Sequence, residues 1–387
     1  MNINTNKEYI RRVAIKEIKA KSILRKHKKI DSWFISQYGM NFYRGCNHNC
    51  VYCDGRSEGY YVEGKFGKDV LVKINAIDLL RRELDPKRKR IPLKRCYIML
   101  GGGVGDSYQP IEKKYQLSRK ALHVIHHFNF PVSILTKSTL VERDLDIIKK
   151  INEKNRAIVS FSFSSTDEKI SSIFEPGVPP PKDRLETLKL FKNEGIACGM
   201  FLLPVIPFAT DTSKIIEETI KQAKEIDLDF IIFGGMTLKE GRQKNYYYDI
   251  LKNYDSNLIT KYKKIYKKDR WGHPGEEYYK SLHLTFSRIL KKYKIPCRIP
   301  PRLFNDILSE NDLVVVILEQ IDYLLKMERK KSPFGYAAYS ISKLTEPLAK
   351  IKNNLRQLKG VGPTTERIIL EILETGTSAY YEKLLYG

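Results

Sequence analysis

Between residues 35 and 235, short apolar runs alternate with longer stretches in which apolar residues recur every three or four positions. The short runs are rich in β-branched and aromatic residues and end at glycine, proline or polar residues, as buried strands do. The longer stretches have the periodicity of amphipathic helices. The expected strands are 96–102, 131–137, 157–163, 197–204 and 229–235, and the expected helices between them are 111–128, 140–154, 181–195 and 212–226.

Alternation of strand and helix predicts a parallel sheet with helices packed on it. With one more strand before Cys46, about six such units are expected, which favours an α/β fold with a partial (β/α)6 barrel over a complete eightfold barrel. Residues 1–34 are expected to be a basic lead-in with some helical periodicity, and 35–235 to be the barrel. A Tyr- and Lys-rich helical extension is expected over 236–330, and a small all-α C-terminal domain of four or five short helices over 331–387.

The charge of the chain indicates a polyanionic partner. Its 387 residues include 69 Lys and Arg against 45 Asp and Glu, a formal net charge of +24. Nucleic acid is the first candidate and an anionic membrane surface the second, although solvated lysine-rich faces account for part of the excess. No apolar stretch is long enough to span a bilayer, and the N-terminus has no apolar signal segment. A cytoplasmic protein with reduced thiols is therefore expected.

Three cysteines lie within eight residues, in the sequence RGCNHNCVYC. Thiolates at Cys46, Cys50 and Cys53 can hold three corners of a four-iron, four-sulfur (4Fe-4S) cluster and leave one iron open to a small chelator. Structural zinc is the alternative, but its only nearby fourth ligand is His48, inside the same short loop. The other cysteines are isolated and are expected to be ordinary buried thiols: Cys96, Cys198 and Cys297.

The C-x3-C-x2-C spacing after a first strand, with Tyr52 before the third cysteine, resembles the radical S-adenosylmethionine (radical SAM) superfamily. In that family the open iron is chelated by the amino and carboxylate groups of S-adenosylmethionine. Together with the cysteine motif, four further motifs in matching order resemble the spore-photoproduct-lyase-like group, often described as DNA repair photolyases. They are 104–112, 135–148, 174–188 and 203–211, and the resemblance extends over about 35–300.

The resemblance implies roles for residues at the ends of the expected strands. The family grips the methionine amino group with the glycine-rich turn after the second strand. A lysine after the third strand contacts the cofactor carboxylate, and a serine on the fourth makes a polar contact. Glu175 and Arg184 are expected to form an ion pair that orders a loop over the site. The implied cofactor-binding residues are Tyr52, Gly101, Gly102, Gly103, Lys137 and Ser162.

One departure from the family concerns the hydrogen-atom donor. The lyase carries a cysteine three residues before an aspartate, and this thiol returns a hydrogen atom to the product radical. Here the aspartate corresponds to Asp106 and the position three residues earlier is Gly103, which has no S–H group. Either another residue donates, with Tyr108 and Cys198 as candidates, or the substrate differs. A different substrate is the favoured interpretation.

The tail contains QLKGVGPTTERIILEIL over 357–373. A Gly-Val-Gly turn before a helix that opens with Pro and Thr exposes backbone N–H groups, which can hold a phosphate. The segment resembles the helix-hairpin-helix of DNA repair proteins, with a plain helical turn as the alternative. The implied nucleic-acid contacts are Gly360, Gly362 and Thr364, and an aspartate at either glycine should block them.

The sequence thus favours a radical SAM enzyme that forms a 5′-deoxyadenosyl radical from S-adenosylmethionine at a 4Fe-4S cluster. It is expected to act on nucleic acid, in repair or modification of DNA, and to take electrons from a donor such as ferredoxin or flavodoxin. Two alternatives stay open. One is a radical enzyme that acts on RNA, a peptide or a small metabolite, and the other is a DNA-binding protein with a structural or redox-sensing cluster.

Overall fold

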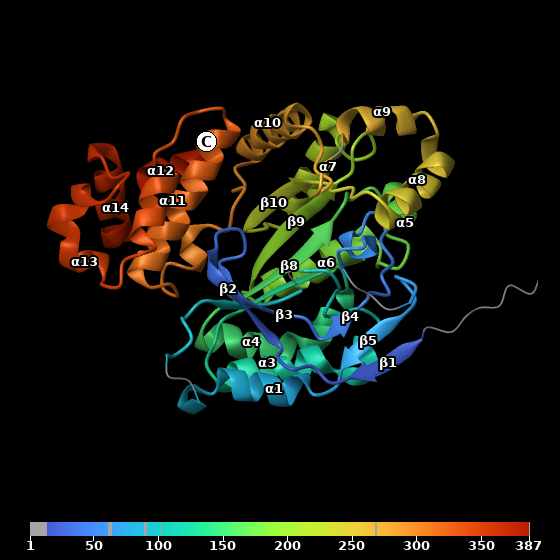
Figure 1. The fold of residues 1–387 in the computed structure, drawn as a ribbon, viewed down its shortest axis with the longest axis horizontal. Coiled ribbons are helices and arrows are strands. Elements are labelled where there is room, and N and C mark those ends of the chain that lie inside the picture. The colour runs from blue at the N-terminus through green and yellow to red at the C-terminus, as the bar shows by residue number, and fades with distance from the viewer. Residues whose placement is uncertain (1–13, 61–63, 89–90, 102, 268, 387) are drawn as a thin grey trace, which may run out of the picture.

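The computed structural model describes residues 14–60, 64–88, 91–101, 103–267 and 269–386. A curled seven-stranded sheet forms its centre, in the order β10-β9-β8-β7-β6-β3-β2 (Figure 1). Strands β3 to β10 of this sheet are parallel, and β2 is antiparallel at the edge beside β3. The strands are β2 Leu24–Asp31, β3 Ser36–Met40, β6 Tyr97–Leu100, β7 Val132–Thr136, β8 Ala157–Phe163, β9 Ala197–Val205 and β10 Phe230–Gly235. The predicted open α/β half-barrel is confirmed.

Both faces of the central strands are covered, which explains their continuous apolar sequences. All seven residues of β8 are buried, and its register with β7 places Val132 beside Ala157. The amphipathic helices between the strands pack their apolar stripes on the outer face of the sheet (Figure 1). These are α1 Ala76–Leu84, α3 Leu117–His127, α4 Leu145–Lys154, α6 Pro181–Asn193 and α7 Ser213–Glu225.

The basic N-terminal segment differs from the expectation of helical periodicity. Residues Ile15–Ile18 form β1, which pairs in parallel with β5, Val70–Lys73, in a small sheet completed by β4, Tyr43–Arg44. The following basic stretch is β2 of the main sheet. Pairing with partner strands decides the conformation here, because tertiary contacts override weak local propensity. The lead-in's residues 1–13 lie outside the described part of the chain.

Helices dominate the described chain after β10. Over the Tyr-rich extension they are α8 Arg242–Asp255, α9 Leu258–Ile265 and α10 Glu276–Tyr293. The C-terminal unit contains α11 Glu310–Met327, α12 Phe334–Ile341, α13 Leu348–Ile351, α14 Pro363–Thr375 and α15 Ala379–Tyr386, with a 3-10 turn at Lys352–Gln357. None of the described helices is long and apolar enough to cross a bilayer.

Helix α11 joins the C-terminal unit to the sheet. It packs against α12, α14 and α15 on one side and against β2 on the other. The Gln320 side chain donates from Nε2 to the Ser32 carbonyl at 2.6 Å and accepts from the Tyr381 hydroxyl through Oε1. Apolar residues of α11 therefore belong to one continuous core with the barrel.

Candidate functional site

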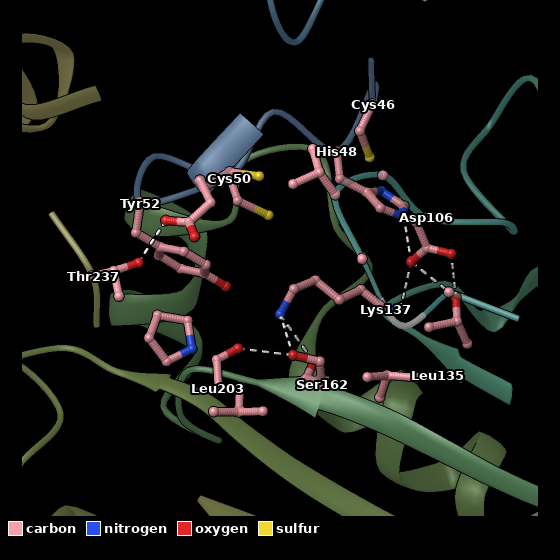
Figure 2. A pocket seen from close by; sticks show the side chains of 18 of the residues that line it. Cys46, His48, Cys50, Tyr52, Asp106, Leu135, Lys137, Ser162, Leu203 and Thr237 are labelled. Carbon is pink, nitrogen blue, oxygen red and sulfur yellow. Dashed lines mark hydrogen bonds and ion pairs between the residues drawn. The ribbon is translucent and has the colours of Figure 1, made fainter. Parts of the chain in front are cut away.

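The carboxyl ends of the parallel strands surround a cavity of about 420 Å³ (Figure 2). Parallel strands bring their carboxyl ends to the same edge of a sheet, so residues far apart in the sequence meet there. Lining residues come from the carboxyl ends of β7, β8, β9 and β10 and from the turn directly after β6, and the cysteine loop closes the opposite wall. The strand-end lining residues are Gly101, Leu135, Thr136, Lys137, Ser162, Leu203, Pro204 and Gly235.

Arg56 holds the cysteine loop in place. Its guanidinium donates from Nε to the Cys50 carbonyl at 3.0 Å and from Nη2 to the Asn49 carbonyl at 3.0 Å. The same group lies 3.7 Å from the ring centroid of Tyr246, on α8. Arg56 is buried, so the charge satisfies backbone carbonyls that would otherwise lie unpaired. The helical extension thereby supports the loop that carries the thiols.

The three thiols of the loop all line the cavity. Burial raises the pKa of Cys50 to about 12 and raises the pKa of Cys46 well above its usual value. Burial thus disfavours the free thiolates, and a bound metal cation would stabilise them.

The spacing of the thiols fits a large metal group better than a single ion. Among the described residues, no three His, Cys, Asp or Glu side chains converge as one metal ion requires. In Figure 2, Cys46 and Cys50 lie well apart along the loop. In a cuboidal cluster each thiolate binds a different iron, so separate cysteines on one loop are compatible with such a cluster.

His48 and Asp106 tie the cysteine loop to the strand ends. The His48 ring donates from Nδ1 to the Gly177 carbonyl at 2.9 Å, and its Nε2 lies 3.2 Å from Asp106 Oδ2. Asp106 also accepts from the backbone N–H of Lys137 at 2.7 Å and from the Thr136 hydroxyl at 2.8 Å. Burial would raise the pKa of Asp106, but His48 and the backbone N–H groups of Lys137 and Tyr108 lower it below its usual value.

Neither residue of this link was assigned such a role from the sequence. His48 was weighed only as a zinc ligand, and Asp106 only as a reference point for alignment. Two signals could have found the pair, because one is a histidine inside the cysteine motif and the other an acid just after a buried strand. Their contact depends on the fold, since 58 positions of chain separate them.

Lys137 lies beside Ser162 at the cavity (Figure 2) and belongs to a buried network of charges. Its Nζ is 2.9 Å from Glu175 Oε1 and 3.0 Å from the Ser162 hydroxyl. Glu175 also accepts from the Tyr52 hydroxyl and pairs through Oε2 with Arg184 Nη2 at 2.8 Å. Burial alone would raise the pKa of Glu175, but Lys137 and Arg184 lower it far below its usual value.

The expected Glu175–Arg184 ion pair is therefore present, and it does more than order a loop. Both side chains are fully buried, and Arg184 also donates to the Ser162 carbonyl at 2.8 Å. The carboxylate fixes Lys137 and Tyr52 against the same side of the cavity. The expectation from the sequence described the pair but not its hold on these two residues.

The structure brings the predicted cofactor residues together. Tyr52, Gly101, Gly103, Lys137 and Ser162 all line the cavity with the three thiols. Gly101 has φ of +93°, and a Cβ there would lie 2.0 Å from the Leu135 carbonyl oxygen, so only glycine fits this turn. Gly102 lies outside the described residues. Their contacts with a cofactor remain a prediction.

The two candidate hydrogen-atom donors do not reach the cavity. Tyr108 is wholly buried near Glu112 and Asp144, and Cys198 Sγ faces the Leu188 and Ile196 carbonyls. Neither residue lines the cavity. Gly103 does, and a Cβ built there meets nothing within 4 Å.

The second predicted site, the hairpin turn before α14, lies in the C-terminal unit, on the opposite side of the molecule from α5 (Glu168–Phe174) and α8 (Figure 1). Gly360 has φ of +88°, and a Cβ there would lie 2.6 Å from the Ala337 nitrogen. Gly362 is the N-cap of α14 without a side-chain cap hydrogen bond, and Thr364 in the first turn is exposed. Uncapped N–H groups at this end of the helix suit an anion.

Two family models match the chain. The radical SAM superfamily model matches residues 40–223, from the end of β3 into α7, and a helix-hairpin-helix domain model matches 309–378. The second match begins ahead of residue 331, where the C-terminal domain was expected to start, and includes α11. Both matches confirm resemblances inferred from the motifs.

Relatives and solved structures agree with these matches. An uncharacterized protein of Methanocaldococcus jannaschii is 34% identical over 213 residues, which cover 55% of this chain and 75% of that protein. An uncharacterized protein of Mycobacterium tuberculosis is 28% identical over 263 residues, 67% of this chain and 75% of that protein.

Similar solved structures include spore photoproduct lyases. One complexed with dinucleoside spore photoproduct has a TM-score of 0.54 at 19% identity, covering 72% of this chain and 79% of that one. A mutant lyase with bound AdoMet and the same dinucleoside also has a TM-score of 0.54 at 19% identity, with coverages of 72% and 78%. At this identity the likeness establishes the fold.

Proposed function

Because the chain belongs to the radical SAM superfamily, we propose that it cleaves S-adenosylmethionine reductively and acts on nucleic acid, with a DNA lesion as substrate. The observation that carries this proposal is the single cavity at the strand ends. It collects the three loop thiols together with Gly101, Lys137 and other residues to which the resemblance assigns cofactor contacts.

The residues of the cavity would have three roles: to hold the cluster, to bind the cofactor and to exclude water. A 4Fe-4S cluster on Cys46, Cys50 and Cys53 would supply the electron for homolytic cleavage of the sulfonium S–C bond. The Lys137 ammonium would bind the cofactor carboxylate, and the Gly101 turn would let backbone groups approach the amino group. Apolar lining residues exclude water from the reacting atoms, among them Phe34, Leu135, Leu203 and Pro204.

Three observations support nucleic acid as the substrate class. The formal charge is +24, and a helix-hairpin-helix model covers the C-terminal unit. The solved structures with a similar fold include a lyase complexed with a dinucleoside photoproduct.

The reaction also needs an external reductant, for which a ferredoxin or flavodoxin is the expected partner.

We favour a lesion other than the spore photoproduct. The resemblance places the thiol that donates hydrogen at Gly103, and among the described residues the only cysteines that line the cavity are the three of the cluster motif. A thymine radical formed by this enzyme would therefore have no thiol outside the cluster loop to quench it.

The test is anaerobic turnover of the reconstituted protein with dithionite, S-adenosylmethionine and oligonucleotides that carry defined lesions. Formation of 5′-deoxyadenosine coupled to one modified product, measured by mass spectrometry, would identify the substrate. A full cluster without any cofactor cleavage would contradict the enzymatic proposal and favour a structural or redox-sensing cluster.

Spore photoproduct dinucleotide gives a second arm to this experiment. We expect no clean conversion by the wild type, and efficient conversion would contradict the choice of another lesion. Gly103→Cys fits the open space at that position. Conversion gained only by this variant would show that the cavity accepts the lesion and lacks only the donor.

A further inference from the structure

Helix α12 leaves two tyrosines in water. Tyr336 is 65% exposed and Tyr339 is 64% exposed, more than any other Phe, Trp or Tyr side chain in the described ranges. The two positions are three residues apart and so share one face of the helix. The opposite face is buried in the core through Phe334, Ala337, Ala338 and Ile341. Within the described residues, the two tyrosine side chains therefore stay largely exposed to solvent.

This tyrosine face lies directly beside the hairpin turn. The Ser340 hydroxyl donates to the Lys359 carbonyl at 2.8 Å. A Cβ at Gly360 would lie 2.6 Å from the Ala337 nitrogen and 2.8 Å from Tyr336 Cβ. A strand whose phosphate sits on the hairpin would thus pass next to the helix that carries the two tyrosines.

Positive charge surrounds the same face. The Lys343 ammonium lies 5.0 Å from the centroid of the Tyr339 ring. Lys343 and Lys359 are exposed, and neither forms an ion pair with any residue that the structure describes. Exposed aromatic rings among unpaired cations match the chemistry of a single nucleic-acid strand, which has bases that stack and phosphates that carry charge.

We propose that Tyr336 and Tyr339 form a stacking platform for unpaired bases of DNA, beside a phosphate contact at the hairpin. The inference rests on the proposed action on DNA and narrows its substrate to regions with unpaired bases. The bases of an intact duplex are already stacked on each other, so they are closed to the tyrosines. Phosphate contacts at Gly360 and Gly362 alone would not distinguish a duplex from a single strand.

The experiment measures fluorescence anisotropy of the full chain with one DNA sequence as a single strand, as a duplex and as a duplex with an unpaired central loop. The same single strand as RNA is included. We expect the single strand and the looped duplex to bind more tightly than the intact duplex. Tyr336→Ala and Tyr339→Ala should each weaken single-strand affinity by about tenfold, because one base loses its stacking partner.

Matched variants separate stacking from other effects. Tyr336→Phe and Tyr339→Phe keep the ring and should keep the affinity. Trp271→Ala removes another exposed aromatic residue, 57% exposed in the loop between α9 and α10, and should change nothing. The dependence of affinity on salt should be the same in the tyrosine variants as in the wild type, since no phosphate contact is lost.

Several results would overturn the platform. These are equal affinity for single strand and duplex, equal loss on both in the tyrosine variants, or tighter binding of RNA. A concentration-dependent dimer that Tyr336→Ala abolishes would instead make this face an interface between two copies. Absence of any DNA binding would reject the proposed substrate as well, whereas tight duplex binding without a single-strand preference would reject the platform alone.

Discussion

Charged side chains are buried and paired around the cavity of the half-barrel, whereas they are exposed around the hairpin turn before α14 and the neighbouring tyrosines of α12, called the hairpin face below. Around the cavity, Lys137 and Arg184 share the buried carboxylate of Glu175. At the hairpin, Lys343 and Lys359 point into solvent. The first arrangement suits a small ligand that joins a charge network already in place, and the second suits a large polyanion that brings its own charges.

This difference has energetic consequences. A buried ion pair is costly to break, because the surviving charge stays in a medium of low dielectric constant. Removing one exposed cation changes the free energy of folding little, and salt screens the interactions of exposed cations strongly. Mutations around the cavity should therefore act on folding and cofactor binding, whereas mutations at the hairpin face should act on the affinity for DNA and on its salt dependence.

The largest effect is expected at the cysteine loop. Alanine at Cys46, Cys50 or Cys53 should abolish iron binding and cofactor cleavage, since each thiolate would hold one iron of the cluster. Iron content per chain and the visible absorption spectrum measure the loss. Alanine at Cys96 or Cys297, which lie outside the cavity, should leave about four irons per chain. One zinc per chain in the wild type would refute the cluster.

Glu175→Gln should give the next largest effect, on stability. It leaves Lys137 and Arg184 without their shared partner, and loss of one member of a buried pair costs about 3–5 kcal/mol. A lower midpoint of thermal unfolding of the reconstituted protein checks this. The control is Glu277→Gln, because Glu277 and Arg329 form an exposed pair at 2.8 Å whose loss should cost less than about 1 kcal/mol. Equal shifts in the two variants would contradict the comparison.

Lys137→Ala should weaken S-adenosylmethionine binding by about tenfold to a hundredfold, as expected for one charge-assisted hydrogen bond. Iron content should stay unchanged, which separates cofactor binding from cluster assembly. Equilibrium binding under anaerobic conditions measures the affinity. Lys192→Ala is the matched control. Lys192 forms an ion pair at 3.1 Å with Asp229, the residue before β10, and neither residue lines the cavity. An unchanged affinity in Lys137→Ala would remove this lysine from the cofactor site.

The smallest effect is expected at the hairpin. Gly362 has φ of −101° with open space around it, so Gly362→Asp caps α14 without strain and places a carboxylate at the anion site. DNA affinity should fall several-fold, and the slope of affinity against salt should drop by about one phosphate. Gly362→Ala adds no charge and should keep the slope. An unchanged slope in Gly362→Asp would move the phosphate contact elsewhere.

Two other perturbations of the tail are less suitable as tests of DNA binding. Gly360→Asp was expected to act like the change at Gly362, but a side chain there would collide with α12 at a positive φ. Deleting residues 331–387 would uncover the buried face of α11, which packs on α12, α14 and α15. Both changes would disturb folding as well as any contact with DNA.

The sequence by itself determined the features that depend on local pattern. Alternating apolar runs and amphipathic stretches gave the strands of the half-barrel, because the periods of strand and helix are properties of short segments. The spacing of Cys46, Cys50 and Cys53 and the Gly-Val-Gly turn indicated the two family matches for the same reason.

Only the tertiary structure decided which distant residues meet. Residues 24–31 carry no clear strand pattern and become β2 through pairing with β3. Cys198 lies at the start of β9 and Leu203 near its carboxyl end, so only Leu203 reaches the cavity at the ends of the parallel strands. The link between His48 and Asp106, and the approach of Tyr336 to Gly360, likewise depend on how elements pack, which no local period encodes.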